Sequence, residues 1–527
     1  MTFPEFAPSP DRMPALVNWF QADWQCLERR LDVPYSPQRW NRLGTFFDEW
    51  RQILTDTPFD DLTPSDKADW LLLRGLLNAE TRRLHREREQ FAAIEPLLPF
   101  AADLVALEES RRRHEDVDPE NAAERLARAL VSLRQTQQVL TDSPIPPNAG
   151  HAALAVNKIR AMLDTWFSFR FGYDPLFAWW VERPFRALDK ALGEYAERLN
   201  AQTANGEMVL EAPLGRDALI EELQNAQITD TPEELVAAAR TEWDWCRTEL
   251  RRAARDMNCG DDWRAALEQV KRGHETPGNQ PALVRNLAQE AIAYVQENDL
   301  VTVPPLAAEC WRMEMMSAER QKVNPFFLGG EAIVVSFPTH EMDHAEKRMS
   351  LRGNNRAFAR ATVQHELIPG HGLQEYFQTR VRPYRQLFFT PFWTEGWTLH
   401  WEMLLWERDF ARTPEERVGM LFWRLHRAAR VIFSLGYHLG TMTAPECVEM
   451  LVNEVGHERE NALAEVRRSF AGDYPPLYQC AYLVGGWQMH GLYHEMTAGG
   501  MTPRAFHDAV LAENCMPIPT LHALLRA

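Results

Sequence analysis

The chain has 527 residues, of which 45% are hydrophobic and 25% charged, and this composition is typical of a globular protein large enough for several cores. Its formal net charge of −18 argues against binding to nucleic acid or to an anionic membrane surface. No apolar stretch is long enough to span a bilayer, so we expect no membrane partner.

The N-terminus and the cysteines bear on the location of the protein. The first twenty residues lack the basic region, apolar run and small-residue cleavage site of a secretory signal. The seven cysteines are scattered without C-x-x-C spacing, a pattern that suits a reducing compartment. We therefore expect a cytoplasmic protein without disulfide bonds.

Amphipathic helices are predicted along the first half of the chain, because apolar residues recur at three- and four-residue spacing opposite faces rich in Glu and Arg. The predicted helices lie near 66–92, 103–114, 119–141, 151–170, 185–203, 215–226 and 232–256. Thr231 and Thr413 each precede Pro-Glu-Glu, which combines an N-cap residue with proline and acidic residues in the first turn. Helices are therefore predicted to begin directly after both threonines.

One β-strand is predicted at residues 332–337, which are rich in β-branched residues and bounded by glycines and a proline. As an edge strand it could hold an extended peptide by main-chain pairing, and a short structural hairpin is the alternative. We expect a mainly α fold, a large multi-helix body with a central cleft and a small β element near 331–337. A helical domain of residues 1–300 is expected to flank the cleft, and a helical catalytic domain is expected over 301–527.

The segment from His365 to His371 (HELIPGH) contains two imidazoles and a carboxylate, the side chains of a zinc hydrolase. An unbroken helix would place the two His roughly 120° apart and about 9 Å apart along its axis, which is too far for one zinc ion. Pro369 and Gly370 offer a remedy, because proline interrupts a helix and glycine accepts unusual backbone angles. We therefore predict a helix that breaks after Ile368 and brings His371 round to the metal.

The residue types in this segment suit hydrolysis. Neutral imidazoles bind zinc, and a catalytic zinc ion keeps three protein ligands and one water. Glu366, which directly follows the first His, is the natural general base for that water. The alternative interpretation is a helix end with a capping Glu366 and solvated histidines.

Residues 365–374 (HELIPGHGLQ) resemble the HExxPGHxLQ signature of domain-of-unknown-function family 885, a mostly bacterial family. Further segments resemble the family's motifs in the expected order, over about 365–490 in all: 395–402 (EGWAxYxE), 430–438 (RLVxDxGxH), 465–469 (EVxRY) and 479–485 (QxxxYxxG). The sequence departs from these motifs at Gly372, His400, Ser434 and Ser469. The family is grouped with HExxH-type zinc metallopeptidases, helical proteins similar to carboxypeptidase Taq and the thimet-type oligopeptidases.

The resemblance implies a third metal ligand at Glu395, thirty residues after His365. Glu402, seven residues after Glu395, is expected to orient a ligating His through a hydrogen bond. Alternatives for the third ligand are Glu402 itself, Glu375 and His400.

The resemblance also suggests donors for the oxyanion that forms when an amide is attacked. Tyr482 is the first candidate, followed by His438 and Tyr437, and a buried core tyrosine is the alternative for Tyr482. Arg430 and Arg468 match family arginines and could clamp a substrate carboxylate. Buried structural ion pairs are the alternative for both arginines.

A second pair of histidines, His340 and His344, has the regular H-E-x-x-H spacing. The surrounding residues are polar, Asp343 lies inside the motif and Pro338 precedes it, whereas a zinc-binding helix packs apolar residues there. We therefore expect the start of a surface helix at this pair, with a metal site or a substrate-side role as alternatives.

Taken together, the sequence predicts a hydrolase with a Zn²⁺ cofactor and a peptide substrate, acting as a carboxypeptidase or dipeptidase if the arginine clamp exists. Two other functions stay open. One is a non-catalytic protein that uses a degenerate peptidase fold to bind a peptide or partner. The other is a zinc hydrolase of a non-peptide amide or ester.

Overall fold

The computed structural model describes residues 12–140, 146, 148–201, 210, 212–321, 326–472 and 474–527. It divides the chain into two compact units, Met1–Val209 and Leu210–Ala527. The division lies earlier than the boundary expected near residue 300. The reason is that helix α9 (Pro232–Asp256) packs along α18 (Pro414–His438), so residues between 210 and 300 join the second unit.

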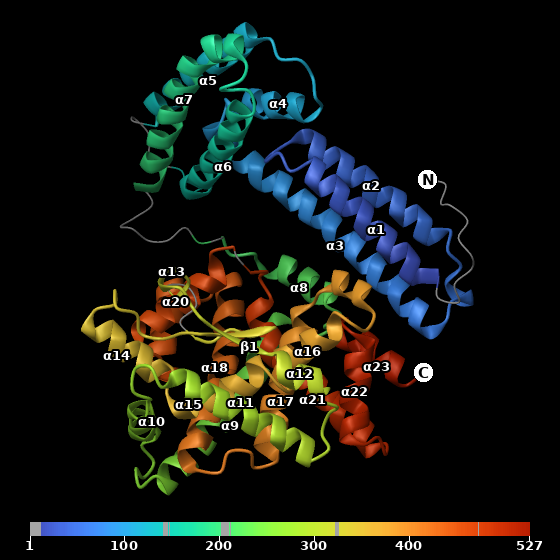
Figure 1. The fold of residues 1–527 in the computed structure, drawn as a ribbon, viewed down its shortest axis with the longest axis vertical. Helices are drawn as coiled ribbons and strands as arrows, with labels where there is room; N and C mark the ends of the chain where they lie inside the picture. The colour runs from blue at the N-terminus through green and yellow to red at the C-terminus, as the bar shows by residue number, and fades with distance from the viewer. Residues whose placement is uncertain are drawn as a thin grey trace. The chain divides into compact units, whose positions relative to one another are not determined.

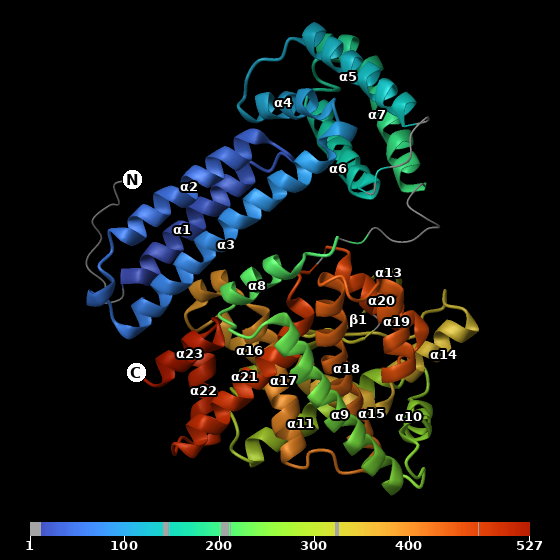
Figure 2. The same cartoon turned by 180° about the vertical axis from the view of Figure 1, so that it is seen from behind.

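The first unit is entirely helical in its described residues (Figures 1 and 2). Its elements are α1 (Arg12–Arg30), α2 (Pro37–Thr55), η1 (Phe59–Asp61), α3 (Pro64–Ile94), η2 (Glu95–Leu97), α4 (Ala101–Arg112), α5 (Pro119–Val139), α6 (Ala149–Ser168) and α7 (Pro175–Ala201). Helices α1–α3 lie side by side, and α4–α7 pack around a core of Leu, Ala and Phe side chains. The helices expected in this unit are present, with small differences at their ends.

Helix α7 differs most from its prediction, because it begins at Pro175 and not near residue 185. Pro184 lies inside this helix, where proline usually ends or kinks one. Residues 141 and 202–203, the predicted ends of two helices, lie outside the described residues.

The second unit contains the remaining elements: α8 (Arg216–Asn225), α9, α10 (Trp263–Arg272), α11 (Gln280–Glu297), α12 (Pro305–Cys310), α13 (Ala318–Gln321), α14 (His344–Gly353), α15 (Arg356–Glu366), α16 (His371–Gln378), η4 (Pro383–Phe388), α17 (Pro391–Glu407), α18, α19 (Ala444–Met450), η5 (Leu451–Val455), α20 (Arg459–Phe470), α21 (Tyr478–Ala498), α22 (Pro503–Glu513) and α23 (Ile518–Leu525). Helix α18 is buried along most of its length by α9, α15 and α21. The prediction of a mainly α fold is confirmed. Among the described helices, none has an apolar stretch that could cross a membrane.

Both predicted helix starts are confirmed. Thr231 accepts a hydrogen bond from the Glu234 amide and forms a capping box with its carboxylate, and Thr413 accepts one from the Glu416 amide. Capping is local in sequence, so these two starts could be read from a few residues.

The predicted β element is a two-stranded parallel sheet of β1 (Arg312–Met315) and β2 (Ala332–Val335). β2 also forms an antiparallel bridge between Val334 and Leu328 on its other side. The strand at 332–337 therefore exists, although it ends at Val335. On that other side β2 has only this single bridge, so the pairing of an extended peptide with the strand stays a prediction. The bridge is antiparallel, as the hairpin alternative expects, whereas the pairing with β1 is parallel.

Candidate metal centre

The predicted break between His365 and His371 is present and begins at the end of Glu366. Helix α15 ends there, and Leu367 leaves the helical region with φ −111° and ψ −105°. The chain then returns so closely that a Cβ on Gly370 would lie 1.8 Å from the carbonyl oxygen of His365. Only glycine fits this approach, and Trp397 holds the loop by donating its indole N–H to the Pro369 carbonyl at 2.9 Å. His371 is thereby the first residue of α16.

The two imidazoles face one carboxylate, as the sequence predicted. His365 Nδ1 donates to Glu402 Oε1 at 2.6 Å, and His371 Nδ1 donates to Gln374 Oε1 at 3.3 Å. A neutral imidazole that donates from Nδ1 carries a lone pair at Nε2. The Nε2 atoms of His365 and His371 lie 3.7 and 3.3 Å from Glu395 Oε2.

The positions of these three atoms suit a shared metal ion better than direct hydrogen bonds between them. Glu395 Oε2 is buried and has no hydrogen-bond partner among the residues that the structure describes, although a buried polar atom normally has one. Tetrahedral zinc with ligands at 2.0–2.1 Å separates neighbouring ligand atoms by about 3.3–3.4 Å. The observed 3.3 and 3.7 Å are close to this spacing. His365, His371 and Glu395 can therefore hold Zn²⁺ with a position left for water.

Glu395 is placed by a close crossing of α17 and α21. A Cβ on Gly396 would lie 2.7 Å from the Gly485 backbone, so glycine at both positions lets the helices touch. The crossing brings Tyr478 of α21 to Glu395, and its hydroxyl donates to Oε1 at 2.6 Å. Tyr478 was not predicted from the sequence. Its position four residues before Tyr482, on the same helix face, was the available signal.

Glu366 lies beside the cluster of His365, His371 and Glu395, and it does not cap a helix. Its carboxylate is within 4.8 Å of the ligand nitrogens of both His365 and His371. The Gly329 backbone covers it so closely that a Cβ there would lie 2.5 Å from Glu366 Oε2. Burial raises the pKa of Glu366 above its ordinary value. A carboxylate in this environment is a better proton acceptor than one in water.

Glu402 orients His365 and is fixed in turn by Arg427. Arg427 Nη2 donates to Glu402 Oε1 at 3.3 Å. Burial alone would raise the pKa of Glu402, but Arg427 and His365 outweigh burial and hold the pKa below its ordinary value. The carboxylate therefore stays charged and keeps the proton of His365 on Nδ1. Arg427 is a second residue that the sequence analysis did not identify.

The two other candidates for the third ligand lie elsewhere. The carboxylate of Glu375 lies against Gly330, where a Cβ would be 2.9 Å from it. His400 hydrogen-bonds to His490 and His507. Neither has a described contact with Glu395.

Tyr482 lies beside His365, and Arg468 contacts Tyr482. The Tyr482 ring is nearly parallel to the His365 ring at a centroid distance of 6.3 Å, and its hydroxyl accepts a hydrogen bond from Arg468 at 3.4 Å. Burial, followed by the charge of Glu395, raises the pKa of Tyr482 to about 12, so the hydroxyl stays protonated. Arg468 has no ion-pair partner in the part of the chain that the structure describes, and its buried Nε is unpaired. An arginine without an acidic partner favours the substrate clamp over the structural ion pair.

Arg430 and His438 are less suited to their predicted roles. Arg430 Nε donates to Glu465 at 2.5 Å, and both side chains are buried, which favours the alternative of a structural ion pair. His438 accepts from the Leu214 amide and packs on Phe470. It lies eight residues beyond Arg430, or about 12 Å along the helix, and none of its described contacts reaches the cluster. Tyr437 stacks on Phe470 at 3.8 Å, also away from it.

The second histidine pair is the start of a helix, as expected. Asp343 is the N-cap of α14 and forms a capping box with Glu346. His340 and His344 are both exposed, and His340 lies in the turn before the helix. Among the described residues, the groups spaced to hold a metal do not include this pair.

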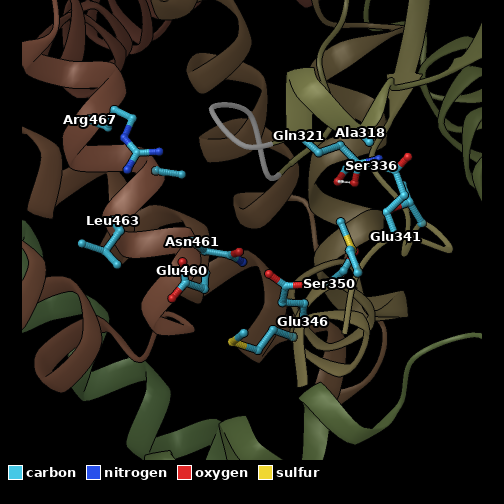
Figure 3. A pocket seen from close by; sticks show the side chains of 14 residues that line it. Ala318, Gln321, Ser336, Glu341, Glu346, Ser350, Glu460, Asn461, Leu463 and Arg467 are labelled. Atoms are coloured by element: carbon cyan, nitrogen blue, oxygen red, sulfur yellow. Dashed lines mark hydrogen bonds between the residues drawn. The ribbon is translucent and has the colours of Figure 1, made fainter. Parts of the chain in front are cut away.

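Two of the cavities in the second unit bear on the site. One of about 210 Å³ lies beside the break between α15 and α16, where Ile368, Gly372 and Gly330 line it together with the charged residues Arg312, Glu331, Glu375 and Arg380. The other, of about 400 Å³, lies between α20 on one side and residues near Gln321 and Ser336 on the other (Figure 3). His365, His371 and Glu395 line neither of these two cavities. The smaller one is nearer to the candidate metal centre along the chain, because its lining includes Gly372, which directly follows His371.

A family model described as "Bacterial protein of unknown function (DUF885)" matches residues 21–525. The chain belongs to this family. The match extends the resemblance seen over 365–490 to nearly the whole sequence, and it includes the first unit, in which we found no motif. The DUF885 description names no activity, so activity remains a matter of proposal.

Two solved structures share the fold. One is described as "a putative lipoprotein of unknown function" from Shewanella oneidensis, with a TM-score of 0.73, 16% identity, and coverage of 99% of this chain and 100% of that one. The other is described as "the putative lipoprotein from Colwellia psychrerythraea", with a TM-score of 0.63, 15% identity and 99% coverage of both chains. No curated protein matches the chain.

These descriptions correct the expected location. Proteins of the same fold are described as lipoproteins, so the prediction of a cytoplasmic protein is wrong. That prediction came from missing signals in the sequence, and a missing signal carries less information than a present one.

Proposed function

We propose that this DUF885 protein is a zinc-dependent peptidase. The observation that carries the proposal is the buried Glu395 Oε2, which lacks a hydrogen-bond partner among the described residues and lies 3.3 and 3.7 Å from two imidazole nitrogens. Two imidazole lone pairs and a carboxylate oxygen directed at one point suit a bound metal cation. Glu366 supports catalysis over a structural role, because a structural metal site has no use for an adjacent unliganded carboxylate.

Each residue near the site has a role in this proposal. When bound, Zn²⁺ lowers the pKa of a water and polarises a carbonyl oxygen. Glu366 accepts a proton from the attacking water and passes it to the leaving amine. Tyr482 donates its hydroxyl hydrogen to the oxyanion, while Tyr478 and Glu402 hold Glu395 and His365 in position.

Arg468 supports cleavage near a free C-terminus. Its guanidinium has no ion-pair partner among the described residues, so it is available for a bidentate contact with a substrate carboxylate. Arg430 is excluded from this role by its ion pair with Glu465. We therefore propose removal of one or two residues from a peptide's C-terminus.

A peptide library with free and amidated C-termini tests the proposed function. We expect the purified protein to release C-terminal residues from free peptides, to lose this activity after chelation and to regain it with added Zn²⁺. Cleavage of free and amidated peptides at equal rates would exclude the arginine clamp but still support a peptidase. Cleavage of esters or small amides but of no peptide would favour the non-peptide hydrolase, and no zinc-dependent cleavage would favour the binding protein.

A further inference from the structure

A second group of metal-binding side chains lies where α17 and α21 meet, well away from the first. It consists of Glu407, the last residue of α17, with His490 and His494 on α21. The two histidines are four residues apart and share one face of the helix. Glu407 stands twelve residues after Glu395, so about 18 Å of helix separates the two groups.

The three potential ligand atoms are close to one another. His490 Nε2 lies 2.9 Å from Glu407 Oε1 and 3.0 Å from His494 Nε2, and His494 Nε2 lies 3.5 Å from Glu407 Oε1. This spacing approaches the separation of about 3.3 Å between ligand atoms on tetrahedral zinc. The side chain of His494 is 53% exposed and that of Glu407 43%, so an ion can reach the group from solvent.

A chain of buried histidines fixes which nitrogen of His490 carries its proton. His507 Nδ1 must donate to the Leu300 carbonyl at 2.7 Å, because a carbonyl only accepts. Neutral His507 then accepts at Nε2 from His400 Nε2, at 2.9 Å. His400 in turn accepts at Nδ1 from His490 Nδ1, at 3.0 Å.

This series of hydrogen bonds ends at a lone pair on His490 Nε2, which faces the Glu407 carboxylate. With its proton on Nδ1, neutral His490 has none on Nε2, and this atom lies 2.9 Å from Glu407 Oε1. His494 Nε2 can donate only one hydrogen, which cannot bind both His490 Nε2 and Glu407 Oε1. His400 and His507 are fully buried, and burial disfavours an additional proton on these rings. Two acceptors in contact need a positive charge between them.

From this convergence of two imidazole nitrogens and a carboxylate oxygen, we propose that Glu407, His490 and His494 bind a divalent transition-metal ion such as Zn²⁺. Imidazole and carboxylate ligands suit this class of ion, and the hydrogen bond from His490 Nδ1 to His400 supplies the outer-shell partner that ligating histidines usually have. The ion joins one end of α17 to α21. The other end of the same two helices carries Glu395 and Tyr478, so the ion stabilises the arrangement that builds the first cluster.

Zinc stoichiometry tests this site with the chelator-stripped, full-length protein in equilibrium dialysis against micromolar Zn²⁺. We expect His494→Ala to bind one ion fewer than the wild type. His522→Ala is the matched control, because His522 forms a surface pair with Glu495 at 2.9 Å but has no second imidazole. It should bind as many ions as the wild type. Equal binding by wild type and His494→Ala would overturn the proposal, and the group would then be an ion pair of Glu407 with protonated His490.

The first cluster is tested separately with His371→Ala. If both sites exist, the wild type binds two ions and each single variant binds one. If only the second exists, His371→Ala binds as the wild type does and His494→Ala binds none, so the second site stands while the proposed function fails. Zinc should also raise the melting temperature of His371→Ala but not that of the double variant His371→Ala/His494→Ala. If zinc does not raise the melting temperature of His371→Ala, the proposal that the ion joins α17 to α21 is contradicted.

Discussion

Replacing Glu366 with Gln should lower peptide hydrolysis by about 10²–10⁴-fold, the usual effect of losing a well-placed general base. Glutamine keeps the size of the side chain but cannot accept the proton of the attacking water. The amide also fits the space under Gly329, where the carboxylate lies now. The rate is measured with the best peptide from the library, and zinc content is measured on the same sample.

The bound zinc separates a catalytic role from a structural one. We expect Glu366→Gln to keep the zinc content of the wild type, because Glu366 is not one of the three proposed ligands. Turnover above a few per cent of the wild-type rate would show that another group is the base. Loss of zinc together with activity would make Glu366 a ligand, and the assignment of Glu395 would then need revision.

Replacing Glu395 with Ala should remove the zinc of the first cluster and, with it, the activity. The variant leaves two imidazoles, and it leaves the Tyr478 hydroxyl without its acceptor. Zinc content by mass spectrometry and the melting temperature together distinguish loss of the ion from loss of the fold.

Glu375→Ala is the matched control for Glu395→Ala, because Glu375 was an alternative ligand and also lies near the break between α15 and α16. We expect it to retain zinc. If Glu395→Ala kept its zinc and its activity while Glu375→Ala lost both, the third ligand would be Glu375. Zinc retained by both variants would transfer the role to Glu402, which lies 2.6 Å from His365.

The parts of the site that could be predicted are those that depend on neighbours in sequence. Pro369 and Gly370 indicated a broken helix, and the break is present because Gly370 passes against the His365 carbonyl. The spacing of Glu395 and Glu402 placed both on one face of α17. The Thr231 and Asp343 caps depend on the three residues that follow them.

The remaining parts depend on contacts between distant segments. Tyr478 reaches Glu395 from 83 residues away, through a helix crossing that only the glycines at 396 and 485 permit. Arg430 is neutralised by Glu465 of another helix, and the two motifs that contain these residues do not indicate that they pair. His438 shares a motif with Arg430 but lies about 12 Å further along α18, beyond the site.

The strand β2 shows the same limit. Its composition predicted a strand, but its partner β1 is a segment of four residues, Arg-Met-Glu-Met, without the β-branched or aromatic residues that favour a strand. Whether β2 lies at an edge depended on this partner and on Leu328.

The metal centre is tested by the zinc content of the purified wild-type protein beside His371→Ala, with His344→Ala as the control. We expect one zinc ion per chain fewer in His371→Ala than in the wild type, and no change in His344→Ala. Equal zinc content in the wild type and His371→Ala would contradict the metal centre at His365, His371 and Glu395. A loss confined to His344→Ala would instead place the ion at the exposed start of α14.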